Sequence, residues 1–129
     1  MQPMNPNETR LCGMLGMAHK AGRLSFGTER VLETIRFRRP RLVLAASDIS
    51  ENTRKRLINS CNYYSEEYGY PIEYREMELT MDALSHCLGQ RGAVSCAALE
   101  DKGFTEAIKK LVDLCGQTSG SERDVPQEV

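Results

Sequence analysis

The sequence predicts an α/β fold, a three-layer α/β/α sandwich with a small mixed central sheet. Helical patterns, in which apolar residues recur every three or four positions, alternate along the chain with short apolar runs. Two of these runs, 42–46 and 93–98, are apolar almost throughout, as expected of strands that helices cover on both faces. We therefore expect these two runs to lie side by side in the centre of the sheet.

Four elements are predicted in the first half of the chain. Leu11, Leu15 and Ala18 form the apolar stripe of a first helix, for which Asn7 is the predicted N-cap and Gly22 the stop. A short strand at 24–26 and a second helix follow, and Pro40 ends that helix because proline cannot continue it. The central strand 42–46 completes this half.

The second half begins with a helix that extends to about Tyr68. Its N-cap is either Asp48, in a capping box with Glu51, or Ser50. The remaining predicted elements are strand 71–74, a short helix 81–88 capped by Thr80, strand 93–98, and a last helix to residue 115 capped by Asp101.

One domain, residues 8–115, contains all of these elements. Residues 1–7 are predicted to be a flexible N-terminus, and the polar, Gly- and Ser-containing residues 116–129 a disordered tail. No apolar run approaches the ~20 residues of a membrane span, and the first ten residues lack a secretory signal, so a cytoplasmic protein is predicted. The five cysteines are widely spaced without a Cys-Xaa-Xaa-Cys pair, which predicts reduced, metal-free thiols.

No pattern typical of an enzyme is present. The sequence has no Gly-rich phosphate loop, and His19 and His86 are far apart without metal-ligand spacing. Cys12 and His19, as nucleophile and base, would lie ~10 Å apart on one helix, beyond hydrogen-bond reach. We therefore predict no catalysis, no cofactor, no metal and no small-molecule substrate.

The charge distribution points to nucleic acid. The net charge is +6 over residues 1–56 and −7 over residues 57–129. Arginine's planar fork suits phosphate and base edges, and a helix start with Gly27 at its entry offers free amides to phosphate. Seven cations lie within 22 residues that contain only two acidic residues: Lys20, Arg23, Arg30, Arg36, Arg38, Arg39 and Arg41. We expect the loop after the first helix and the start of the second to form one basic surface.

All five tyrosines fall between residues 63 and 74. This cluster is either a platform for stacking unpaired bases or the packing of a helix end against the sheet with the hydroxyls at the surface. The pattern favours packing.

Three segments in order resemble the L7Ae/L30e ribosomal protein superfamily, in particular its bacterial YlxQ-like branch. These are 16–22 (GMAHKAG), 27–36 (GTERVLETIR) and 42–53 (LVLAASDISENT), and the segments 84–89 and 101–104 fit the same pattern. The resemblance covers roughly residues 10–113. It implies the sandwich fold and binding to kink-turns or related structured RNA, ribosomal RNA included, with the ribosome as a further partner, no cofactor and no membrane.

The resemblance also implies site residues. The family motif Gly-Xaa-Asn-Glu-Xaa-Xaa-Lys aligns on Gly27 and places Glu29, Arg30 and Glu33 at the Asn, Glu and Lys positions. Glu29 and Glu33 cannot donate as Asn and Lys do, and both repel phosphate. The predicted RNA-binding residues are Lys20, Arg23, Gly27, Thr28, Glu29, Arg30, Glu33 and Arg36, with Leu79 and Thr80 from the loop after the third strand.

The predicted function is therefore that of an RNA-binding accessory factor of translation. The lost donors at Glu29 and Glu33 leave a second possibility open, a protein-interaction module of the same fold that no longer binds kink-turns. The basic cluster favours the first.

Overall fold

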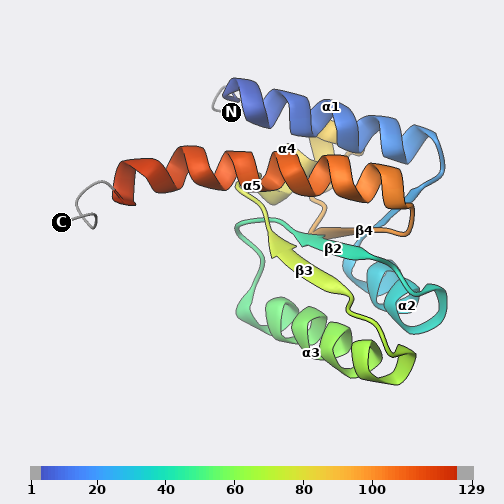
Figure 1. Cartoon of the computed structure of the whole chain (residues 1–129). Helices are drawn as coiled ribbons and strands as arrows, with labels where there is room; N and C mark the ends of the chain where they lie inside the picture. Colours follow the sequence, from blue (N-terminus) through green and yellow to red (C-terminus); the bar gives the residue numbers. More distant parts are fainter. Residues whose placement is uncertain (1–3, 125–129) are drawn as a thin grey trace.

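A four-stranded mixed sheet separates two layers of helices in the computed structural model of the chain (Figure 1). The structure describes residues 4–124, and for 117–124 it describes only their place in a helix. In chain order the elements are α1 (Pro6–Lys20), β1 (Leu24–Phe26), α2 (Thr28–Arg38), β2 (Leu42–Ala45), α3 (Glu51–Tyr68), β3 (Glu73–Glu76), α4 (Met81–Cys87), β4 (Cys96–Leu99) and α5 (Lys102–Asp124).

The strand order is β1-β4-β2-β3, with β2 parallel to β3 and antiparallel to β4, and β1 antiparallel to β4. The two apolar runs thus lie side by side at the centre, which confirms the predicted architecture. β3 begins at Glu73 rather than at 71, because Pro71 has no N–H and the Ile72 amide donates to Ser65 Oγ instead. β4 begins at Cys96 rather than at 93, because the Val94 amide turns back to the Met81 carbonyl.

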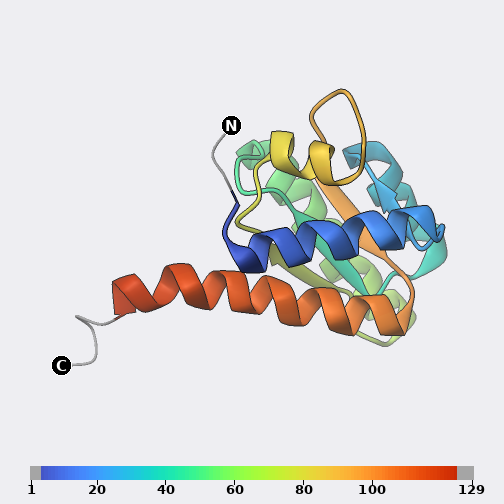
Figure 2. The ribbon, with the colours of Figure 1, turned by 90° about the horizontal axis from the view of Figure 1, so that it is seen from above.

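Successive side chains of the central strands enter different layers, as the period of a strand requires. Leu42, Leu44 and Leu99 pack in the cluster formed with α1, α4 and α5. Val43 and Ala98 pack in the second cluster, with α2 and α3. Figures 1 and 2 show α1 and α5 crossing one face of the sheet side by side.

Side-chain caps fix most helix starts. Asn5, not Asn7, caps α1 in a capping box with Glu8. Ser50 caps α3, which decides between the two predicted candidates. Thr80 caps α4, and Asp101 Oδ2 accepts from the Phe104 amide at the start of α5, both as predicted.

Helix α1 includes Pro6 and Asn7, and α5 continues through Asp124. The domain bounds 8–115 stay a prediction. Proline is favourable in a first helical turn, and a stretch containing Gly and Ser can extend a helix that is already nucleated by packing. Residues 1–3 and 125–129 lie outside the described residues. Among those described, no helix is both long and apolar enough to cross a membrane.

The prediction of five reduced cysteines is wrong for one pair. Cys12 in α1 and Cys87 in α4 form a disulfide, with their Cα atoms 5.0 Å apart. The two are 75 residues apart, and only the packing of α1 against α4 brings them together. Cys61, Cys96 and Cys115 are free and buried, as predicted, and burial raises the pKa of the Cys61 thiol to about 12.

The two ends of the sheet are called the Gly27 end and the Arg41 end, after the residues that lie there. At the Gly27 end, the Gly27 amide donates to the Cys96 carbonyl and the Ala46 amide to the Ser95 carbonyl. At the Arg41 end, the Arg41 amide donates to the Leu99 carbonyl, and Leu24 and Leu42 both pair with Leu99. Helix α2 runs from the first end to the second.

Candidate nucleic-acid interface

Helix α2 begins with an uncapped turn at the Gly27 end. Gly27 has φ +95° and ψ 144° and makes no side-chain cap. An α-helix leaves its first amides without intrahelical acceptors, here those of Thr28, Glu29 and Arg30. Together with the helix dipole, such amides form an anion-binding position.

A neutral recess lies beside this helix start. The hydroxyls of Thr28 and Ser95 share a 2.6 Å hydrogen bond, which ties α2 to the loop before β4. Met81, Gln90 and residues 92–95 form the other walls, and the recess has a volume of ≈ 470 Å³ without an ionisable side chain in its lining. Its size and lack of charge suit an unstacked base, with the helix amides placed for the adjoining phosphate.

The charge of Glu29 is offset by a residue that sequence analysis missed. Arg56, from α3, forms an ion pair with Glu29 at 3.0 Å. Both side chains are exposed, so the pair is weak, yet it places a cation beside the helix start. The two residues are 27 positions apart, and no local pattern connects them.

The loop after β3 reaches the same end of the sheet. The Leu79 carbonyl accepts from the Ser47 amide, and Met81 lines the recess. Thr80 uses its hydroxyl to cap α4. The Leu79 side chain is only 3% exposed and packs in the core, and its contact with an unstacked base stays a prediction.

The predicted basic residues do not form one surface. Arg30 and Glu33 lie in a separate depression with Gly22 and Leu24 along the side of α2. Lys20 and Arg23 flank the turn into β1 at the Arg41 end. Arg36 lies near the C-terminus of α2, where its carbonyl accepts a hydrogen bond from Tyr68.

The structure therefore separates the predicted surface into two. The eleven residues of α2 span ~16 Å between its ends. Gly27, Thr28, Glu29 and Thr80 lie toward one end, and most of the arginine cluster toward the other.

The tyrosine cluster packs, as the sequence favoured. Tyr64, Tyr68, Tyr70 and Tyr74 are partly buried against the core between α2 and α3, while Tyr63 is 57% exposed. Tyr68 and Tyr70 donate to the carbonyls of Arg36 and Arg39 and thereby satisfy the C-terminal turn of α2. No group of three potential metal ligands occurs within the part of the chain described.

Comparison with known proteins places this arrangement in a family. The model of the ribosomal protein L7Ae/L30e/S12e/Gadd45 family matches residues 9–109. The chain belongs to this family. Among L7Ae-family relatives, RNA-binding protein YlxQ of Bacillus subtilis (strain 168) is 32% identical over 100 residues, 78% of this chain and 92% of that protein. RNA-binding protein YlxQ of Enterococcus faecium is 29% identical over 108 residues, 83% and 95% of the two chains.

Solved structures agree with the L7Ae-family fold. A protein with unknown function from Bacillus halodurans C matches with a TM-score of 0.69 and 24% identity, over 81% of this chain and 97% of that one. The Giardia lamblia 15.5kD RNA binding protein matches with a TM-score of 0.60 and 13% identity, over 88% and 91%. At these identities the likeness concerns the fold.

Proposed function

We propose that this chain is an RNA-binding accessory factor of translation in the cytoplasm that contacts a kink-turn or related structured RNA, ribosomal RNA included, through its Gly27 end. Membership of the L7Ae family and the two relatives named as RNA-binding proteins support RNA as the ligand. The observation that carries the choice of surface is the neutral recess between Thr28 and Ser95 beside the uncapped start of α2.

Each part of this surface has a role in the proposal. The first amides of α2 donate to a backbone phosphate, and the recess receives an unstacked base. The exposed side chains of Arg56 on α3, beside the helix start, and Arg91 on the loop before β4 supply sequence-independent attraction. Binding is then expected to weaken steeply with salt.

The test replaces Glu29 and Glu33, the two glutamates that differ from the family motif, by the residues of that motif. Glu29→Asn removes a negative charge, restores a neutral donor and releases Arg56 from its ion pair. Glu33→Lys replaces a repulsion by an attraction. Together they are expected to strengthen binding of a labelled kink-turn RNA at least tenfold, about 1.4 kcal/mol, in titrations at two salt concentrations.

A matched control makes the same change in charge at positions distant from the Gly27 end. Glu66→Lys with Glu67→Asn makes the same change on exposed positions ten residues beyond Arg56 on α3, ~15 Å along the helix. This variant is expected to change kink-turn binding less than threefold. The pair Glu29→Asn and Glu33→Lys is expected to raise the affinity for a plain RNA duplex less than the affinity for the kink-turn.

The alternative, a protein-interaction module, has its own outcome in the same titration. It holds if the unmodified protein binds no RNA at low salt and the double substitution restores none.

A further inference from the structure

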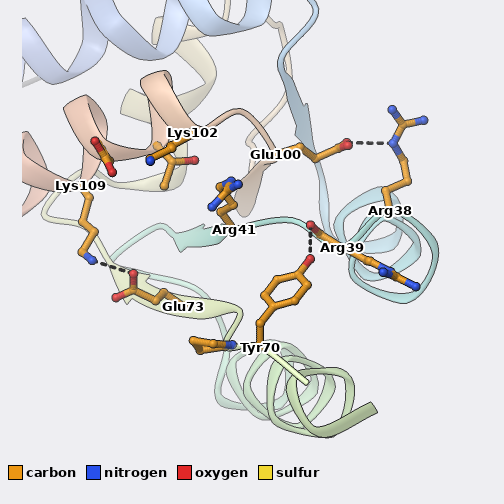
Figure 3. Close-up of a pocket in the computed structure, with 11 residues that line it drawn as sticks. Arg38, Arg39, Arg41, Tyr70, Glu73, Glu100, Lys102 and Lys109 are labelled. Carbon is orange, nitrogen blue, oxygen red and sulfur yellow. Dashed lines mark hydrogen bonds and ion pairs between the residues drawn. The ribbon is translucent and has the colours of Figure 1, made fainter. Parts of the chain in front are cut away.

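A second pocket lies at the Arg41 end, on the far side of the molecule from the recess. It encloses ≈ 540 Å³ between the C-terminus of α2 and the starts of β2, β3 and α5. Five of its lining residues are cations: Arg38, Arg39, Arg41, Lys102 and Lys109. Figure 3 shows Arg41, Lys102 and Lys109 on one side of this site, while the side chains of Arg38 and Arg39 point away from them at its rim. We call the site the arginine pocket.

The charges in the arginine pocket are only partly balanced from within. Three carboxylates also line it, and two of them are engaged: Glu100 with Arg38 at 2.8 Å and Glu73 with Lys109 at 2.6 Å. Arg41 and Lys102 form no ion pair with any residue the structure describes. Arg39 forms none either, and Glu106 is the one lining carboxylate without an ion pair among the described residues, so the lining keeps a net charge of +2.

An unsatisfied hydroxyl points to the same conclusion. Thr105, in the first turn of α5, is 5% exposed and lines the pocket. Its Oγ1 has no hydrogen-bond partner among the described residues. A buried hydroxyl without a partner is costly, and it is satisfied when a ligand oxygen accepts its proton.

The backbone beneath the arginines is held from several sides. Arg39 has φ +54°, a left-handed conformation that is unusual for a residue other than glycine. The Tyr70 hydroxyl donates to the Arg39 carbonyl at 2.7 Å, and Pro40 is fully buried. The Arg41 amide and carbonyl both bond neighbouring strands. The backbone that carries Arg39 and Arg41 is thus a fixed turn, which limits the positions that their side chains can reach.

The positive charge continues outside the pocket. Lys20, Arg23 and Arg36 lie toward the same end, are exposed, and pair with no carboxylate within the described part of the chain. A free phosphate or a mononucleotide would occupy only the pocket. A polyanion would use the pocket and the cations beyond it.

We infer that the arginine pocket binds a backbone phosphate of the RNA, as a second contact at the opposite end of α2 from Gly27. Arg41 and Lys102 neutralise the phosphate, and Thr105 donates its hydroxyl to one of the phosphate oxygens. The inference rests on the proposed RNA-binding function. The strand that reaches the pocket passes along α2.

The experiment compares three pairs of substitutions by titration of labelled kink-turn RNA with extended stems. Arg41→Gln with Lys102→Gln is expected to lower affinity about tenfold and the slope of log affinity against log salt by roughly one to two units. Arg10→Gln with Lys110→Gln removes the same charge from exposed positions elsewhere that form no ion pair with any residue the structure describes, and it is expected to cost less than threefold. Arg56→Gln with Arg91→Gln reports on the Gly27 end, because Arg56 lies beside the start of α2.

Thr105→Val tests whether the hydroxyl contacts the RNA, because a purely structural role would not change the RNA affinity. The free protein loses no described hydrogen bond, so its melting temperature is expected to hold or rise. RNA affinity is expected to fall about threefold. Unchanged affinity with a raised melting temperature would mean that the hydroxyl has no ligand.

The outcomes separate the two proposals. If the Arg56 and Arg91 pair weakens binding and the Arg41 and Lys102 pair behaves like the control, the arginine pocket is refuted and the proposed function stands. If the unmodified protein binds no RNA, both fail. If adenosine monophosphate shifts the Thr105 amide signal in nuclear magnetic resonance spectra but the pocket pair leaves RNA binding intact, the pocket serves a free nucleotide and the inference is wrong.

Discussion

Gly27 occupies backbone angles, φ +95° and ψ 144°, that a residue with a Cβ adopts only under strain. An added Cβ would meet no atom within 4 Å, so the cost is conformational rather than a collision. Gly27→Ala is expected to lower the free energy of unfolding by about 1–3 kcal/mol, measured by urea denaturation. Gly13→Ala, in the open on α1, is the control and is expected to stabilise by about 0.5–1 kcal/mol. Equal effects would show that Gly27 is unstrained.

The Glu73 carboxyl makes the free energy of unfolding depend on pH in the acidic range. Its hydrogen bond with Lys109 is the main reason that its pKa lies below the ordinary value. A carboxyl whose pKa is lower in the folded than in the unfolded protein stabilises the folded state. This contribution is complete above the unfolded pKa, ~4.3, and it is lost as the pH falls through the folded pKa.

Glu73→Gln is therefore expected to flatten the decline of the urea midpoint between about pH 5 and pH 2. Glu66→Gln, at an exposed position that forms no ion pair with a residue the structure describes, is expected to leave the decline as it is. Identical profiles for all three proteins would remove Glu73 from the acid response.

Sequence patterns predicted individual residues where the interaction is local. Thr80 and Asp101 cap helices three residues ahead, and that spacing is visible in the sequence. The ion pair of Glu29 with Arg56 and the hydrogen bond of Thr28 with Ser95 join residues 27 and 67 positions apart. Such partners are set by the packing of elements, which no local pattern encodes.

At the scale of elements, apolar periodicity predicted each helix and strand, but not how closely two helices approach. Gly16 allows α1 to lie against α4, since a Cβ there would be 3.1 Å from the Cys87 carbonyl oxygen. The same approach brings Cys12 to Cys87. The prediction of free thiols failed because it rested on spacing along the chain.

The disulfide between α1 and α4 is expected to stabilise the oxidised protein by limiting its unfolded state. A cross-link across 75 residues contributes about 2–4 kcal/mol. Cys12→Ser with Cys87→Ser is expected to unfold at lower urea than the oxidised protein and to be insensitive to dithiothreitol. If the reductant leaves the midpoint of the unmodified protein unchanged, the bridge contributes nothing.

For the whole molecule, the sequence predicted the three layers and the central strand pair but placed the RNA surface in one position. Residues 20–41 are continuous in sequence, yet β1 and α2 carry the chain from the Arg41 end to the Gly27 end and back. A charge cluster along the chain therefore becomes two positions in space. The neutral recess, assembled from residues 26–28, 81, 90 and 92–95, has no counterpart in any single motif.

If the Gly27 end and the arginine pocket contact the same RNA, their contributions to the binding free energy are expected to add. Substitutions at sites more than 7–10 Å apart add in free energy to within about 0.5 kcal/mol, and the two ends of α2 are ~16 Å apart. If Arg56→Gln with Arg91→Gln and Arg41→Gln with Lys102→Gln each weaken binding tenfold, all four together are expected to weaken it about a hundredfold, near 2.8 kcal/mol. Titration of one extended kink-turn RNA measures this. A fourfold variant that binds no more weakly than one of the pairs would contradict two independent contacts to the same RNA.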